Sequence, residues 1–439
     1  MPRQLEGKAD SILERGALAS GAAGSRAALT LLLAINMFNY IDRQVLAAVQ
    51  PSIGRDLKLN DQQMGWAATA FLLSYMLLSP LFGWLGDRMS RWILIAIGVV
   101  GWSLASGATG LAQTFAILLL TRCFVGIGEA AYGPTAPTLL SDLYPVRVRG
   151  TILAWFYVAI PVGSALGYVF GGLIESHVGW RSAFYLLLPP GLLLGALCLF
   201  MKEPRRGLSD HIDQPEKVQM GWKDYVQLFR TKSYLLDTAG MTAMTFAMGG
   251  VAYWMPAYLA EDRHAGSLAT VNLMFGAIVA ITGIVATLAG GWLADRLRAR
   301  FPGSYFLVSA AGLMAAFPAF ILLLITPFPF GWVWVFVGCF CLFFNTGPSN
   351  TILANVTRPE IRSTAFALNI LVIHTLGDAI SPPLIGAVAD AVDRVRPHAG
   401  LGAGFLLVSI LMVVGSLLWF WGARYLQADT RAISGEVQV

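Results

Sequence analysis

Long apolar runs separated by short polar stretches make up most of this chain. A helix that crosses a bilayer needs about 20 mostly apolar residues, and runs of that length recur along nearly the whole sequence. The pattern predicts an all-α membrane protein with twelve spanning helices. The expected spans are 27–50, 63–85, 92–111, 114–140, 150–173, 180–201, 236–260, 268–293, 303–326, 329–355, 362–388 and 400–425.

An internal repeat divides these spans into two equal sets. The sequence Gly-Trp-Leu-Gly-Asp-Arg at 83–88 returns as Gly-Trp-Leu-Ala-Asp-Arg at 291–296, a shift of 208 positions. A Gly-Pro pair at 133–134 likewise recurs at 347–348. Repeats of this kind are typical of secondary transporters, so we expect two pseudo-symmetric six-helix bundles.

One long polar stretch lies between the sixth and seventh spans and separates the two bundles. We therefore expect five regions. They are a cytoplasmic N-terminal tail at 1–26, an N-terminal six-helix bundle at 27–201, a cytoplasmic inter-bundle linker at 202–235, a C-terminal six-helix bundle at 236–425 and a cytoplasmic C-terminal tail at 426–439.

The distribution of Lys and Arg predicts the orientation of the chain in the membrane. Only 13% of the residues are charged while 56% are hydrophobic, and 22 of the 30 Lys and Arg residues fall on the side of the two termini. The positive-inside rule then places both termini in the cytoplasm, and we expect a multi-pass monomer in the inner (plasma) membrane. The net charge of +5 reflects this topology, so no nucleic-acid partner is expected.

The repeated pattern resembles the major facilitator superfamily over essentially the full length of the chain. The signature of that family, Gly-x-x-x-Asp-Arg/Lys-x-Gly-x-Arg/Lys, is matched at 83–91, with Ser90 in place of the second glycine. The resemblance implies a gate at the cytoplasmic helix ends; a charged turn that fixes topology is the alternative. The candidate gate residues are Gly83, Asp87, Arg88, Arg91, Gly291, Asp295 and Arg296.

Charged side chains are rare within the expected spans. Asp42 and Arg43 lie in the first span, and Arg122 and Glu129 lie in the fourth. Because a charge at mid-membrane costs roughly 2.5 to 3.5 kcal/mol, such residues normally face a cavity and have partners. The repeat places phenylalanines at the positions equivalent to the two fourth-span charges, so the cluster is confined to the N-terminal half. This asymmetry favours a function over an ion pair that only fixes helix registry.

Arg122 and Glu129 are seven residues apart, which is nearly two helical turns and about 10 Å along one face. They are poorly placed to pair with each other, and Asp42 from the first span is the expected partner between them. Gly126 and Gly128 lie between the two charges and allow close approach of another helix or a ligand.

The segment Asn-Tyr-Ile-Asp-Arg at 39–43, the fourth-span pair and the segment at 374–382 resemble the Spinster branch of the superfamily. Eukaryotic members of that branch export sphingosine 1-phosphate or move lysophospholipids. The resemblance implies a bacterial-type member in which Asp42, Arg122 and Glu129 form a proton-responsive cluster, with Arg43 in the same polar patch.

Further polar and aromatic residues are candidates for the wall of the cavity. His374 and Asp378 are one helical turn apart, and they indicate either a second titrating site or a hydrogen bond within one helix. Aromatic residues in the seventh and tenth spans suit the tail of an amphiphile. The cavity candidates are Asn39, Tyr40, Tyr253, Trp254, Phe343, Asn345, His374 and Asp378.

No phosphate-binding loop, metal-ligand cluster or nucleophile motif is present, so neither an enzyme nor a cofactor is expected. We expect a proton-coupled transporter that moves an amphipathic, lysolipid-like or sphingolipid-like substrate by alternating access. Protonation of Asp42 or Glu129 would release Arg122 for another contact. The alternatives are a carrier of organic anions or sugar phosphates, a multidrug proton antiporter, and a receptor or scaffold of transporter ancestry.

Overall fold

The computed structural model describes residues 2–86, 88–144, 146–204, 228–357 and 361–434. The predicted gate residue Asp87 and most of the predicted linker lie outside this part of the chain. Every regular element in the described part is a helix. The helices are α1 (Pro2–Leu57), α2 (Asp61–Gly86), α3 (Arg91–Thr109), α4 (Phe115–Tyr132), α5 (Thr135–Leu143), α6 (Val146–Val178), α7 (Trp180–Cys198), α9 (Lys232–Ala257), η1 (Tyr258–Asp262), α10 (Leu268–Leu297), α11 (Ser304–Ile325), α12 (Gly331–Phe343), α13 (Thr346–Asn355), α14 (Arg362–Ile373), η3 (His374–Asp378), α15 (Ser381–Asp393), α16 (Gly400–Gly422) and α17 (Leu426–Ser434).

Ten stretches of the described helices are long and apolar enough to cross a membrane. Three of them combine shorter helices: α4 with α5, α12 with α13, and α14 with η3 and α15. The helices α1 and α9 complete the twelve predicted spans, but polar residues lower their mean hydropathy. The all-helical membrane fold predicted from the sequence is therefore confirmed.

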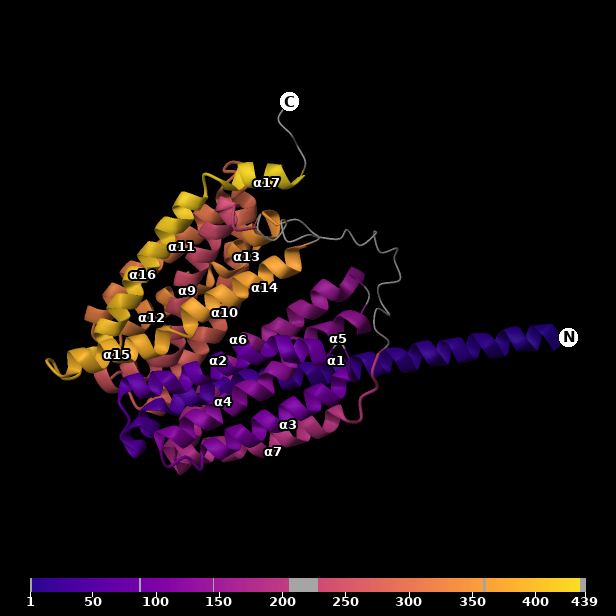
Figure 1. Ribbon diagram of the computed structural model, residues 1–439, viewed down its shortest axis with the longest axis horizontal. Coiled ribbons are helices and arrows are strands. Elements are labelled where there is room, and N and C mark those ends of the chain that lie inside the picture. The colour runs from indigo at the N-terminus through magenta and orange to yellow at the C-terminus, as the bar shows by residue number, and fades with distance from the viewer. Residues whose placement is uncertain (1, 87, 145, 205–227, 358–360, 435–439) are drawn as a thin grey trace.

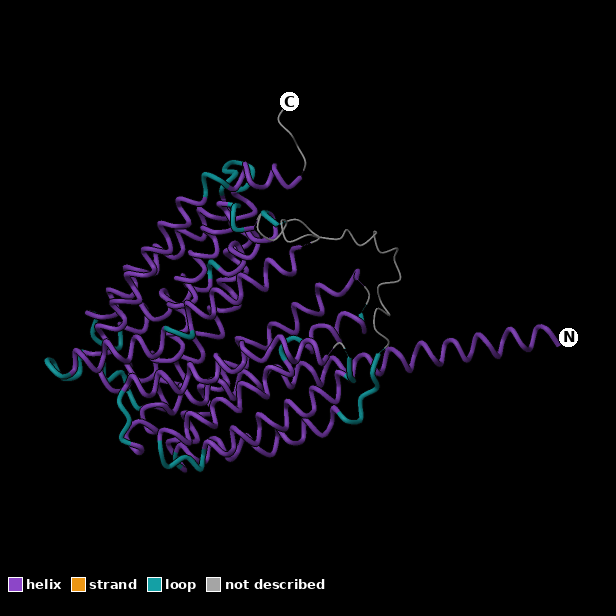
Figure 2. Tube along the Cα trace, in the orientation of Figure 1, coloured by secondary structure: helices purple, strands orange, loops and turns teal. Residues whose placement is uncertain are grey.

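The helices form two bundles, α1 to α7 and α9 to α16. Figure 1 shows the first in indigo to magenta and the second in rose (α9) through orange to yellow, and Figure 2 shows the same arrangement as a trace. The bundles converge where α2 begins and α15 ends, which we call the contact end. They diverge toward the end where α3 begins and α17 lies, which we call the tail end.

The helix boundaries differ from those expected. The helix α1 runs without interruption from Pro2 to Leu57, so the backbone of the predicted tail at 1–26 is helical from residue 2 onward. The helix α6 covers 146–178, several residues more at each end than the predicted span at 150–173. Hydropathy marks only the apolar part of a helix, whereas the backbone hydrogen bonds continue into its polar flanks.

Glycines on α4 allow the close approach that the sequence predicted. A Cβ on Gly126 would meet the hydroxyl of Ser74 and the carbonyl of Phe71 on α2. A Cβ on Gly128 would meet the backbone of α3 at Trp102. The helix that carries Arg122 is therefore wedged between α2 and α3, and its register relative to both is fixed by backbone contact.

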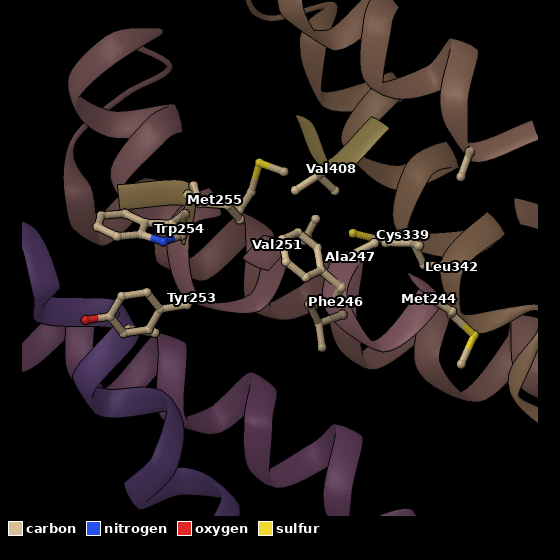
Figure 3. Packing of buried hydrophobic residues seen from close by; sticks show 14 of the residues in the cluster. Met244, Phe246, Ala247, Val251, Tyr253, Trp254, Met255, Cys339, Leu342 and Val408 are labelled. Atoms are coloured by element: carbon tan, nitrogen blue, oxygen red, sulfur yellow. The ribbon is translucent and has the colours of Figure 1, made fainter. Parts of the chain in front are cut away.

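The C-terminal bundle packs around α9. Figure 3 shows its apolar side chains, among them Phe246 and Val251, beside Cys339 of α12 and Val408 of α16. In the same view Tyr253 points toward the N-terminal bundle. The helix α9 therefore supplies both the core of one bundle and a contact to the other.

Candidate functional site

A cavity of about 1000 Å³ lies between the two bundles. Its N-terminal wall comes from α1, α2, α4 and α6, and its other wall comes from α9, α10, α12, α13, α14, η3 and α15. Most lining side chains are apolar or aromatic. The charged residues and the histidine that line it are Arg43, Arg122, His374 and Asp378. The described residues hold no group of three or more His, Cys, Asp or Glu side chains that could bind a metal ion.

Arg43 and Glu129 form a buried ion pair at the N-terminal wall. The Nη2 and Nε atoms of Arg43 lie 2.6 and 2.7 Å from Oε2 of Glu129. The side chain of Glu129 is 1% exposed and that of Arg43 is 22% exposed. The guanidinium also lies 4.8 to 5.3 Å from the ring centroids of Tyr40, Phe71 and Tyr75. Arg43 therefore connects the buried carboxylate to the cavity.

Asp42, the residue before Arg43 on α1, is buried and bonds to α3. Its Oδ1 accepts a hydrogen bond from the Ser106 hydroxyl, and its Oδ2 has no hydrogen-bond partner among the described residues. Ser106 is also buried, and within the described chain no charged donor bonds to this carboxylate. The second oxygen of Asp42 is therefore available to hold a proton or to accept another donor.

Arg122 is 2% exposed, yet it lines the cavity. Its Nη2 donates to the Thr109 hydroxyl at 2.8 Å, and its guanidinium lies 5.5 Å from the ring centroid of Phe184. The Nε atom has no hydrogen-bond partner, and the described residues place no carboxylate within 4.0 Å of Arg122. The expected pairing of Arg122 with Asp42 or Glu129 is absent here, because Arg43 holds Glu129 and Ser106 holds Asp42.

Sequence reasoning missed the hydroxyl residues of α3. Ser103, Ser106 and Thr109 recur every three residues in an otherwise apolar helix, and all three are buried. Residues at this spacing share a face, so the stripe was a readable signal for polar partners of the buried charges. Ser106 and Thr109 now serve as those partners.

Five of the cavity candidates line the cavity, and three do not. The five are Tyr40, Tyr253, Phe343, His374 and Asp378. Asn39 is buried next to Glu129 instead. Trp254 donates from Nε1 to the Pro382 carbonyl at 3.0 Å, and the Nδ2 of Asn345 donates to the Cys341 carbonyl at 2.9 Å. Both side chains bond to helix backbone, which keeps them inside the C-terminal bundle.

His374 and Asp378 face the cavity from a single π-helical turn. The Nδ1 atom of His374 lies 2.9 Å from Oδ2 of Asp378, and both side chains are partly exposed. The contact is a hydrogen bond within one element, which was one of the two expected possibilities. A titrating site at this pair stays a prediction.

The described gate residues contact partners close to them in the same half of the chain. Arg91 pairs with Asp142 at 2.6 Å and with Glu203 at 2.8 Å. Asp295 accepts a hydrogen bond from the Tyr305 hydroxyl at 2.7 Å. Arg88 and Arg296 stack on the tryptophan four residues earlier, and a Cβ on Gly83 or Gly291 would meet nothing within 4 Å. These contacts do not join the bundles at the tail end, so the gate prediction stays a prediction.

Comparison with known proteins assigns the family. The family model described as Major Facilitator Superfamily matches residues 32–382. Protein spinster homolog 1 of Xenopus laevis is 34% identical over 425 residues, which cover 91% of this chain and 81% of that protein. The human protein spinster homolog 1 is 35% identical over 449 residues, covering 95% and 85%. The chain belongs to the Spinster family of the major facilitator superfamily. This Spinster family member is therefore a secondary transporter and not an enzyme.

Solved structures agree on the fold. A bacterial homolog of the human lysosomal transporter Spinster, crystallised in an inward-facing and unoccupied conformation, superposes with a TM-score of 0.82 and 23% identity. The match covers 92% of this chain and 98% of that one. A bacterial homolog in an inward-facing and occupied conformation superposes with a TM-score of 0.79, also at 23% identity, and the match covers 91% and 97%. The arrangement of two helical bundles thus has a counterpart in solved structures.

Proposed function

We propose that this Spinster family member is a proton-coupled transporter of a single-chain amphiphile with an anionic head group, such as a lysolipid. The observation that carries the proposal is Arg122, a buried guanidinium at the wall of a largely apolar cavity with no carboxylate partner among the described residues. A guanidinium binds phosphate or carboxylate through two parallel hydrogen bonds. An anionic head group would supply the counter-charge that Arg122 lacks.

The rest of the cavity suits the tail of such a molecule. Its lining is mostly apolar and includes Tyr253 and Phe343 on the C-terminal wall, opposite the charged cluster. Apolar surface of this kind excludes water and stabilises an acyl chain in proportion to the area covered. Head group and tail would then lie on different walls, so movement of one bundle against the other changes both contacts together.

Proton coupling would act through the two buried carboxylates. Protonation of Glu129 removes the negative charge that holds Arg43, and protonation of Asp42 removes the nearest candidate partner for Arg122. Each event changes the charge presented to the cavity without exposing a new group to lipid. The ion pair seen here then represents one protonation state of the cycle.

A carrier of small hydrophilic anions is the second candidate, and the wall charges disfavour it. Such a carrier would place basic residues on both walls, whereas the described C-terminal wall contributes only His374, already bonded to Asp378. A multidrug antiporter would need to accept cations, and Arg122 repels them.

Flux in proteoliposomes tests the proposed substrate class. With an imposed proton gradient, we expect a fluorescent lysophosphatidic acid to cross the membrane faster than in protein-free vesicles, as measured by albumin extraction. Arg122→Gln should lower this rate roughly tenfold, because it removes a charged hydrogen bond to the head group. Glucose 6-phosphate and ethidium are the controls. Flux of either compound in place of the lysolipid would contradict the proposal.

We also propose that the protein resides in the plasma membrane with both termini in the cytoplasm. The distribution of its basic residues supports this orientation. A cysteine at Val395, an exposed position at the contact end, should then react with a membrane-impermeant maleimide added to intact cells. A cysteine at Arg424, exposed at the tail end, should react only after lysis. The reverse result would invert the topology.

A further inference from the structure

The contact end is held by side chains of one bundle that donate to backbone carbonyls of the other. Among the described residues four buried donors do this, two from each bundle. The bonds are Thr69 Oγ1 to Ala379 O at 2.5 Å, Tyr168 OH to Ala252 O at 2.5 Å, Tyr253 OH to Met64 O at 2.6 Å and Asn272 Nδ2 to Ala48 O at 2.9 Å. These bonds have to break when the bundles separate at this end.

Charged groups also join the bundles at the outer rim. One contact is the exposed ion pair of Arg55 with Glu261 at 3.8 Å, and the other is a carboxylate that accepts backbone N–H groups. Asp390, in the last turn of α15, accepts the backbone N–H of Asp61 at 3.1 Å through Oδ1 and that of Gln62 at 3.0 Å through Oδ2. These are the first two N–H groups of α2, which have no acceptor within their own helix. A carboxylate at this position is also favoured by the positive end of the helix dipole.

The start of α2 is also capped by residues of its own bundle, so Asp390 provides a second cap. Asn60 and Gln63 cap each other reciprocally, with Gln63 N donating to Asn60 Oδ1 at 2.8 Å and Asn60 N donating to Gln63 Oε1 at 3.1 Å. Such a capping box is sufficient to begin a helix in most proteins. The N-terminal bundle therefore has the residues that it needs to begin α2. Asp390 of the opposite bundle supplies the acceptor for the N–H groups that the capping box leaves without one.

The backbones of α2 and α15 are in contact beside this cap. A Cβ on Gly65 would lie 2.5 Å from the backbone of Pro382, and a Cβ on Gly386 would meet the backbone of Asp61. Gly65 is one helical turn from Asp61, and Gly386 is one turn from Asp390, so each glycine shares a face with its capping partner. The two helices thus meet in one defined register at which the carboxylate reaches both N–H groups.

Further carboxyl groups lie around the contact, among them Asp262, Glu261 and Asp393. Burial, followed by the neighbouring carboxylates of Asp393, Asp61 and Glu261, raises the pKa of Asp262 to about 7. Near neutral pH this shift weakens the negative charge that Asp262 places beside Asp61 and Asp393.

We infer that Asp390 is a latch between the bundles, and that its bonds to the start of α2 set the balance between the conformation seen here and one that is open at the contact end. The latch goes beyond the proposed function, because it does not depend on the substrate or the coupling ion. Loss of a charged hydrogen bond typically changes an equilibrium constant about tenfold or more. We therefore expect Asp390→Asn to raise the population open at the contact end by about tenfold.

Asp393 provides a matched control three residues away. Its Oδ1 accepts the N–H groups of Ala399 and Gly400 at 3.0 and 2.8 Å, so it caps the start of α16 within its own bundle. Asp393→Asn removes the same charge from the same cluster and weakens the same kind of bond. It leaves the contact between the bundles in place.

Distances between spin labels at Leu111 and Val395 measure the separation of the bundles. Both positions are exposed, and they lie at the contact end of opposite bundles. In a background with the four native cysteines replaced by alanine, Asp390→Asn should increase the fraction of long distances, while Asp393→Asn should match the parent. An unchanged distribution in Asp390→Asn would overturn the latch, and so would an equal increase in both variants. The measurement needs no substrate, so it is independent of the flux result.

Discussion

Replacing Asp42 with asparagine, or Glu129 with glutamine, is expected to abolish proton-driven transport while the protein stays folded. Each carboxylate is 1% exposed and has one oxygen without a hydrogen-bond partner among the described residues. An amide of the same shape keeps the remaining bonds but cannot take up a proton. Coupling between two ligands typically changes affinity about 5- to 150-fold. A pH gradient should change lysolipid flux by a factor in this range in the wild type, and it should have no effect in either variant.

Two substitutions of the same chemistry at the contact end serve as controls. Asp56 bonds to Arg181, and Glu175 bonds to the Ser52 hydroxyl, both away from the cavity. Asp56→Asn and Glu175→Gln should therefore retain the pH dependence of the wild type. Rates are compared in proteoliposomes with and without a gradient. Wild-type pH dependence in both cavity variants would refute the assignment of Asp42 and Glu129 as the coupling groups.

Truncating Arg43 to alanine is expected to destabilise the protein by about 3 to 5 kcal/mol, because it leaves Glu129 buried without a counter-charge. The substitution also removes the guanidinium from its three aromatic neighbours, which adds to the loss. Adding Glu129→Gln to Arg43→Ala should restore part of the stability, since no buried charge then remains unpaired. The free energy of unfolding in mixed micelles measures both effects.

The exposed pair of Arg181 with Asp56 is the matched control for this measurement. Their side chains are 36% and 46% exposed, so Arg181→Ala should cost less than about 1 kcal/mol. A cost for Arg43→Ala no greater than this would show that the pair contributes little to stability. A double variant that loses the full sum of the two single losses would show that Arg43 and Glu129 act independently.

The fold was predictable because long apolar runs combined with an internal repeat are compatible with few architectures. Ten of the twelve expected spans can be recognised by length and hydropathy alone. The break between α4 and α5 falls at the first of the repeated Gly-Pro pairs, and the break between α12 and α13 lies just before the second. Boundaries such as those of α1 were not predictable, because a helix does not end where its apolar residues end.

Only part of the pairing of the buried charges could be predicted from the sequence. Spacing along α4 correctly separated Arg122 from Glu129, but whether Asp42 or Arg43 reaches the charges of α4 depends on the rotation of α1. Adjacent residues on a helix point about 100° apart, so a small rotation exchanges their roles. Hydrophobic periodicity does not determine that rotation in a span that is buried on most sides.

Trp254 and Asn345 illustrate a second limit. Both have polar groups in apolar helices, which is the pattern expected for a cavity wall, yet each satisfies its donor on helix backbone. A buried donor needs an acceptor, and a free carbonyl at a helix break serves as well as a ligand does. Sequence alone does not distinguish these two uses.

The four donors at the contact end have a further consequence for how this interface varies among related sequences. Because Thr69, Tyr168, Tyr253 and Asn272 each bond to a main-chain oxygen, the residue that provides the acceptor is free to vary without loss of the bond. Statistical methods that infer contacts from paired substitutions have no second position to detect in such a bond. In such an interface each hydrogen bond constrains the amino acid on the donor surface but not the one on the acceptor surface.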